Sequence, residues 1–148
     1  MALFLVSILV AGCKFGPNAE EKYESSFLKI WNELTAKQKK LEQEVKKKQD
    51  NIDELIDVYK QAGDNHKKAK RELNKLIPPS KFKKLHRLAL TFLDAGTKYF
   101  DEITKIAQET KGNYTEEQTQ SLDKLQKEWE SGGIGVQNEA KRLGWEVK

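Results

Sequence analysis

The residue with the most distinctive chemistry in this 148-residue chain is its single cysteine, Cys13. A thiol can form a covalent bond to another group, and the two residues before it, Ala11 and Gly12, are small enough for an enzyme to close around the backbone there. One cysteine excludes a disulfide within the chain, and one cysteine with two histidines does not favour a structural zinc site. The chemistry expected here is covalent modification of the thiol.

The residues before Cys13 form a short apolar run. Residues 3–11 are apolar except for one serine. The run is too short to span a membrane, which takes roughly 18 residues or more, but it has the length of the hydrophobic region of a signal peptide. The segment Val10-Ala11-Gly12-Cys13 resembles the lipobox of bacterial lipoproteins. That resemblance implies cleavage between Gly12 and Cys13 and a thioether from Cys13 to diacylglycerol, with no other cofactor.

The resemblance also implies a division of the chain and a location. Residues 1–12 would be a lipoprotein signal peptide, residues 13–18 a lipidated flexible tether, and residues 19–148 a helical bundle domain. The mature protein would be held by its lipid at the extracytoplasmic face of the bacterial cell membrane. In architecture the body resembles small helical lipoproteins of Gram-positive bacteria and their phages. The alternative is that the apolar run is a strand or helix turn buried in the fold, with Cys13 as a small hydrophobe.

The rest of the chain has the pattern of an all-α protein. Charged residues make up 34% of it, yet its apolar residues recur regularly instead of being thinly scattered. The steps alternate between four and three residues from Phe27 to Leu76, which is a heptad seam. This seam predicts one long helix, or two nearly collinear ones, over residues 19–77. Because the phase continues through Gly63-Asp64-Asn65, we expect a kink near Gly63, although a turn there stays open.

Local signals predict where the other helices begin and end. Pro78-Pro79 ends the first helix, because neither proline has an amide hydrogen to donate, and Ser80 can cap the second helix. Gly112 is available for a left-handed C-cap, and residues 115–118 read as a capping box that opens a third helix. Three glycines within residues 131–135 predict a break, followed by a last short helix.

These elements predict an elongated antiparallel bundle of three long helices with coiled-coil-like packing. The first helix would be about as long as the other two together. If those two cover only half of it, the seam from Phe27 to Val45 needs another partner, for which a second copy of the chain is the candidate. The aromatic residues are interpreted as core. The alternative is a small-ligand or metal carrier with a pocket lined by Trp31, Trp129 or Tyr99.

Basic residues are concentrated around the two prolines. Residues 67–87 hold nine Lys or Arg and one Glu, in a chain whose net charge is only +4. On a single long first helix, this block would lie at the tip farthest from the lipid. It is a candidate site for a polyanion such as an anionic envelope polymer or lipid headgroups, and the alternative is a solvated end that keeps the protein soluble. The nine residues are Lys67, Lys68, Lys70, Arg71, Lys75, Lys81, Lys83, Lys84 and Arg87.

No common catalytic motif is found in the sequence. Both histidines, His66 and His86, lie in lysine-rich neighbourhoods that would lower the pKa of the imidazole. We therefore expect a non-enzymatic interaction module at the cell envelope, with a protein or an anionic envelope polymer as partner and no sequence-specific binding to nucleic acid. A phage or mobile-element lipoprotein that excludes superinfecting phage DNA is the alternative within this class.

Overall fold

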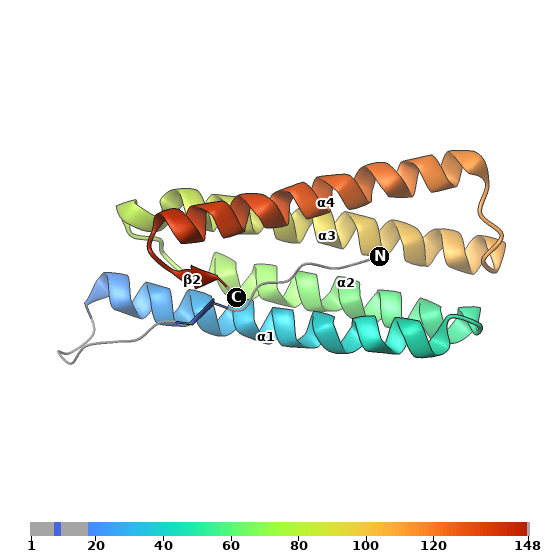
Figure 1. The fold of residues 1–148 in the computed structure, drawn as a ribbon, viewed down its shortest axis with the longest axis horizontal. Coiled ribbons are helices and arrows are strands. Elements are labelled where there is room, and N and C mark those ends of the chain that lie inside the picture. Colours follow the sequence, from blue (N-terminus) through green and yellow to red (C-terminus); the bar gives the residue numbers. More distant parts are fainter. Residues whose placement is uncertain (1–7, 10–17, 148) are drawn as a thin grey trace.

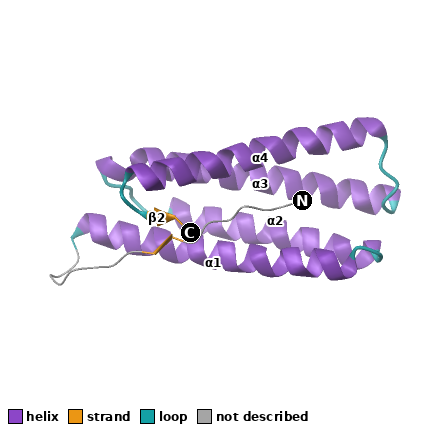
Figure 2. Ribbon diagram, viewed as in Figure 1, coloured by secondary structure: helices purple, strands orange, loops and turns teal. Residues whose placement is uncertain are grey.

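The body of the protein consists of four helices packed against one another (Figures 1 and 2). The structure is a computed structural model that describes residues 8–9 and 18–147. The helices are α1 (Ala19–Lys48), α2 (Ile52–Asn74), α3 (Lys83–Thr110) and α4 (Glu116–Arg142), with a 3₁₀ turn η1 (Ser80–Phe82) before α3. Two short strands, β1 (Ile8–Leu9) and β2 (Glu146–Val147), pair antiparallel beside the helices. The all-helical body is confirmed, but the number of long helices is four and not three.

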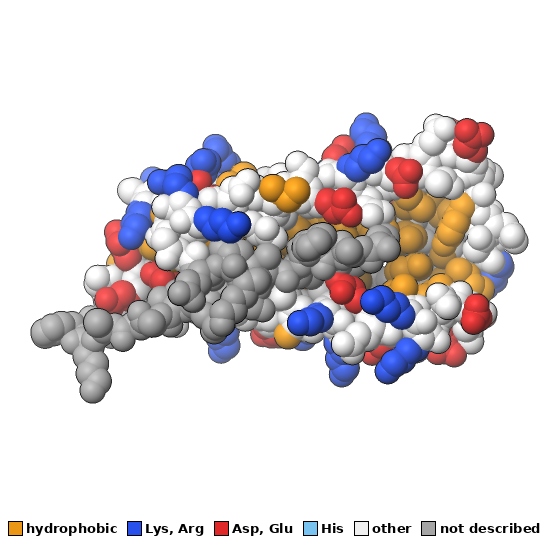
Figure 3. Space-filling model, viewed as in Figure 1, with side chains coloured by type: hydrophobic (Ala, Val, Ile, Leu, Met, Phe, Trp, Pro, Cys, Tyr) orange, Lys and Arg blue, Asp and Glu red, His pale blue; other side chains and the backbone are white. Residues whose placement is uncertain are grey.

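The described helices pack in chain order, and the first and the last of them do not pack against each other. α1 contacts α2, α2 contacts α3, and α3 contacts α4, whereas no Cα of α1 lies within 8 Å of a Cα of α4. On the face drawn in Figure 3 the molecule is hollowed between these two helices, and apolar side chains lie in the hollow. Trp145, just beyond α4, bridges the gap at one end, where its ring centroid lies 5.5 Å from that of Phe27 and 5.6 Å from that of Phe82.

The long first helix predicted from the heptad seam is wrong, because the chain reverses between α1 and α2. A helix N-cap at Asn51 begins α2 and marks the turn locally. Its side chain accepts a hydrogen bond from the backbone N–H of Glu54 at 3.3 Å and donates one to the Glu54 carboxylate at 2.9 Å. An Asn followed three residues later by Glu begins a new helix, so the reversal has a local signal that the continuous seam conceals.

Helix α2 continues through Gly63 without a turn, and α4 does not break within residues 131–135. Glycine permits close helix packing at both places. A Cβ on Gly63 would lie 3.3 Å from a carboxylate oxygen of Asp101 on α3, and one on Gly132 would lie 3.2 Å from the Cα of Phe92. The favourable packing of these helices outweighs the low helix propensity of glycine.

Two of the predicted helix ends are confirmed and one is wrong. Residues 115–118 form a capping box, and α3 ends in the left-handed region, at the C-cap Lys111 with a φ of 50° and at the following Gly112 with a φ of 89°. Ser80 does not cap the second long helix. It begins the 3₁₀ turn η1, which leads directly into α3 without a side-chain cap.

The seam on α1 is covered within the chain and needs no second copy to bury it, while the homodimer itself stays a prediction. Phe27, Trp31 and Leu34 are 1%, 4% and 3% exposed. The ring of Trp31 lies against Phe92 of α3, with 5.3 Å between the ring centroids. The hairpin of α1 and α2 brings the seam onto the rest of the bundle, which a single straight helix could not have done. A homodimer through Phe27–Val45 therefore has no uncovered aromatic seam to use.

Candidate functional site

The reversal after α1 moves the basic block to the end of the bundle where α1 begins (Figure 1). The Lys81 ammonium lies 3.7 Å from the carboxylate of Glu20, and the Tyr23 hydroxyl lies 2.9 Å from Nδ1 of His86. The prediction that this block lies at the opposite tip of the bundle from the start of the first helix is therefore wrong. We call this end, formed by residues 18–24, 71–87 and 139–145, the tether end.

Most of the nine predicted basic residues form ion pairs with described carboxylates. Three of them, on α2, lie away from the two prolines and contact neighbouring helices along the length of the bundle. The pairs are Lys67 with Asp101 at 2.7 Å, Lys68 with Glu33 at 3.3 Å, Lys70 with Asp94 at 2.5 Å, Lys75 with Glu72 at 2.8 Å, Lys81 with Glu20 at 3.7 Å and Lys84 with Glu139 at 2.8 Å. Much of the charge concentrated in the sequence is thus balanced in space by acidic residues from α1, α3 and α4.

Three of the nine cations, Arg71, Lys83 and Arg87, are exposed and have no ion pair to any described residue. They flank the loop between α2 and η1. Ile77 stands in that loop with 89% of its surface exposed, immediately before Pro78-Pro79. Ile77 is a surface residue missed by the motif pattern, although an apolar residue between a lysine-rich stretch and a proline pair is a usable signal.

The two ends of the bundle carry opposite net charge. The tether end holds nine Lys or Arg against five Asp or Glu. The distal end, formed by residues 44–57 and 105–123, holds five Lys or Arg against nine Asp or Glu. Figure 3 shows Lys and Arg side chains gathered over the parts of α3 and α4 nearest the tether end. The bundle is therefore electrically polar along its length.

Glu139 joins α4 to α3 at the tether end. Its side chain is only 3% exposed and accepts hydrogen bonds from the Arg142 guanidinium at 2.6 and 2.9 Å, while the Lys84 ammonium lies 2.8 Å from its other oxygen. These contacts lower the pKa of the Glu139 carboxyl to about 2. The ionised carboxylate thus fixes Lys84 and leaves it less available to an external anion than Lys83.

Tyr23 and His86 connect the beginnings of α1 and α3. Burial raises the pKa of the Tyr23 phenol and lowers that of the His86 imidazole, so both groups are neutral near pH 7. His86 thus has a phenol as its partner and, among the described residues, no carboxylate to orient it as a general base.

We expect Tyr23→Phe to lower the free energy of unfolding by ~1 kcal/mol, because it removes one buried hydrogen bond and leaves Nδ1 of His86 without this partner. Urea denaturation followed by circular dichroism measures the change. Tyr114→Phe is the matched control, since Tyr114 is 37% exposed and its hydroxyl can bind water. A Tyr23→Phe variant as stable as the control would contradict the proposed contribution of this contact.

A second polar group lies inside the bundle, at His66. Its Nδ1 lies 2.9 Å from the Ala62 carbonyl oxygen and 2.9 Å from Nε2 of Gln38. Its Nε2 and the indole nitrogen of Trp129 are buried without a hydrogen-bond partner among the described residues. Burial lowers the pKa of His66 to about 4. The predicted direction is right, but desolvation is the cause and not the neighbouring lysines.

The three residues predicted to line a ligand pocket lie in the core. Trp31, Trp129 and Tyr99 are 4%, 2% and 3% exposed. The ring centroid of Trp129 lies 5.7 Å from that of Tyr99 and 5.0 Å from that of Phe100. These rings fill the space between helices, so the structure gives the ligand-carrier alternative no support.

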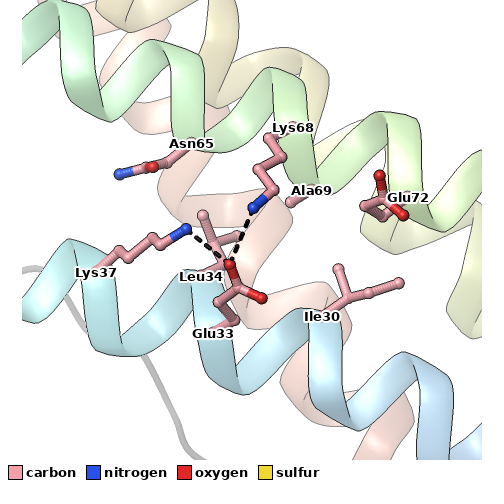
Figure 4. Close-up of a pocket in the computed structure, with 8 residues that line it drawn as sticks. All are labelled: Ile30, Glu33, Leu34, Lys37, Asn65, Lys68, Ala69 and Glu72. Atoms are coloured by element: carbon pink, nitrogen blue, oxygen red, sulfur yellow. Dashed lines mark hydrogen bonds and ion pairs between the residues drawn. The ribbon is translucent and has the colours of Figure 1, made fainter.

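A small surface pocket lies between α1 and α2 (Figure 4). Its volume is about 30 Å³, which is room for roughly one water molecule. Glu33 closes one side, where its carboxylate accepts hydrogen bonds from Lys37 at 2.7 Å and Lys68 at 3.3 Å. The lining residues are Ile30, Glu33, Leu34, Lys37, Asn65, Lys68, Ala69 and Glu72. The pocket is too small for an organic ligand.

The predicted lipid attachment at Cys13 and the cleavage position between Gly12 and Cys13 lie outside the described residues. Within residues 8–9 and 18–147, no cluster of three or more His, Cys, Asp or Glu is placed to hold a metal ion. Among the same residues, no helix has the length and apolar character needed to cross a membrane.

Comparison with known proteins gives no relative. No family model, no curated protein and no solved structure matches this chain.

Proposed function

We propose that this protein is a bacterial lipoprotein, anchored by diacylglycerol on Cys13, whose helical body is a non-enzymatic interaction module at the extracytoplasmic face of the membrane. The observation that carries the proposal is the segment Val10-Ala11-Gly12-Cys13 at the end of an apolar run. It places the lone thiol directly after two small residues. The polar stretch that follows reaches Asn18, the N-cap of α1.

Lipid on Cys13 would supply a stable anchor. Each methylene buried in the bilayer contributes ~0.8 kcal/mol, and two acyl chains hold a protein firmly where one gives only reversible binding. Lipid anchoring requires no catalytic or ligand-binding site in the helices, which is consistent with their apolar core.

The linker would keep the bundle close to the membrane. Asn18 is the fifth residue after Cys13, and an extended chain spans at most ~3.5 Å per residue, so the start of α1 stays within about 17 Å of the anchored cysteine. The tether end, and not the distal end, is therefore the part of the folded body that faces the bilayer.

Cleavage before Cys13 would change one feature of the fold. It would remove β1, so that Glu146–Val147 would lose its antiparallel partner while the four helices would remain. The alternative, in which the apolar run stays in the folded protein, keeps this strand pair. The state of the N-terminus in cells therefore decides between the two forms.

Mass spectrometry of the mature protein, purified from bacterial cells that express the full chain, tests the proposal. We expect a chain that begins at Cys13 and carries a diacylglycerol, and we expect Cys13→Ser to abolish both the added lipid mass and the cleavage. Ser7→Ala, another small polar residue of the same segment, is the matched control and should be processed normally. An unmodified thiol on a chain that begins at Met1 would refute the proposal.

A further inference from the structure

We propose that the tether end is a docking surface for anionic phospholipid headgroups, which orients the bundle with its distal end away from the bilayer. The proposal rests on the membrane anchoring proposed above for its biological setting. The surface itself is defined by described residues: the exposed cations Arg71, Lys83 and Arg87 and the projecting Ile77.

The cations of this surface are available to phosphate. Arg71, Lys83 and Arg87 have no carboxylate partner among the described residues, so lipid phosphates can contact them without breaking an ion pair. Lys75 and Lys81 do have partners, but both side chains are more than half exposed, at 67% and 53%. Exposed pairs of this kind contribute little to stability and exchange readily for another anion. Basic residues near a membrane surface are attracted to its negative potential.

Ile77 suits a bilayer better than a water-soluble polymer. Its side chain is 89% exposed and lies at the loop tip between Lys75 and Pro78-Pro79. In water this exposure leaves apolar surface hydrated, whereas insertion between headgroups would bury it. Exposed cations before and after an exposed apolar residue in the chain match the two layers of an anionic membrane, namely charged headgroups above hydrocarbon. A soluble polyanion has no hydrocarbon layer in which the Ile77 side chain could be buried.

The charge polarity of the bundle favours this orientation. The tether end is net basic and the distal end net acidic, so an anionic surface attracts one end and repels the other. Electrostatic attraction acts over about 10 Å at an ionic strength of 0.1 M, and the linker to Cys13 keeps the tether end within that order of distance.

Vesicle binding of the full chain carrying Cys13→Ser tests the proposal, because this chain has no lipid anchor. The vesicles contain either phosphatidylcholine alone or phosphatidylcholine with phosphatidylglycerol. We expect stronger binding to the anionic vesicles, weakened as salt rises. Replacing Arg71, Lys83 and Arg87 with Glu should lower the affinity roughly 100-fold, since each basic residue near the surface contributes a few-fold.

Matched variants isolate the surface. Lys105, Lys124 and Lys127 are exposed lysines outside the tether end, so their replacement with Glu changes the net charge equally and should have little effect. Ile77→Ser should weaken binding several-fold, whereas Ile134→Ser, at a site 58% exposed on α4, should not. Circular dichroism confirms that each variant is folded.

Three results would overturn the proposal. They are equal binding to neutral and anionic vesicles, an equal loss in the two charge-reversal variants, and tight binding to a soluble polyglycerol phosphate that Ile77→Ser leaves unchanged. The last result would assign the surface to an envelope polymer. All of these measurements use a chain without lipid, so they are independent of whether Cys13 is lipidated in cells.

Discussion

Gly96→Ala is expected to lower the free energy of unfolding by about 2–4 kcal/mol, a large effect for one added methyl group. A Cβ at this position of α3 would lie 2.3 Å from Cδ2 of His66, 2.5 Å from its Nε2 and 2.9 Å from the indole nitrogen of Trp129. His66 and Trp129 are 0% and 2% exposed, so neither ring has free space to move into. Overpacking therefore outweighs the gain of up to ~1 kcal/mol that alanine brings to a helix.

Gly135→Ala is the matched control for this prediction. Gly135 also lies inside a helix, α4, but a Cβ there would make only an ordinary contact, at 3.7 Å from Leu88. We expect this variant to be as stable as the original chain or more stable. Urea denaturation followed by circular dichroism at 222 nm compares the two, and equal stability would show that the Gly96 site accepts a methyl group.

Lowering the pH from 7 to 4 is expected to destabilise the protein through His66. Its pKa is about 4 in the folded chain, below the usual value of 6.5, because burial disfavours the imidazolium. Between these two values the unfolded chain binds a proton on this side chain and the folded chain does not. The contribution of neutral His66 is therefore fully present above pH 6.5 and is lost as the pH falls towards 4.

The expected loss is on the order of 3 kcal/mol, since each unit of pKa difference corresponds to ~1.4 kcal/mol. His66→Phe removes the titration and keeps a ring in the same space. We expect urea denaturation of this variant to give a smaller fall in the free energy of unfolding between pH 7 and 4.5 than the original chain gives. The comparison uses the slope with pH, because the variant also loses the contact with Gln38. Equal slopes would mean that His66 is protonated in the folded protein.

His66, Gly96 and Trp129 form a unit in the core that the sequence did not predict. The histidine comes from α2, the glycine from α3 and the tryptophan from α4. Gly96 inside a helix was a usable signal. Glycine lowers helix stability, so its presence there indicates that a neighbouring side chain packs too closely for a Cβ. The identity of that neighbouring side chain depends on how the helices pack.

The polar and apolar pattern determined much of this protein without reference to tertiary structure. The spacing of apolar residues is enough for an all-helical body, and Pro78-Pro79, Gly112 and residues 115–118 delimit helices by backbone chemistry that acts within a few residues. The prediction of a lipidated Cys13 likewise rests on four consecutive residues. Such signals involve only a few neighbouring residues, so they can be recognised from one sequence without the tertiary structure.

Tertiary packing decided the direction of α2 and, with it, the place of the basic block. A heptad seam continues in phase whether the chain runs straight or reverses, so apolar spacing could not distinguish a kink near Gly63 from the turn at residues 49–51. Burial of Phe27 and Trp31 against the other helices favours the reversal, and the glycines of α2 and α4 remain helical because they admit close neighbours. The reversal brings the cations to the end of the bundle where α1 begins, an arrangement that depends on contacts between residues more than 60 positions apart.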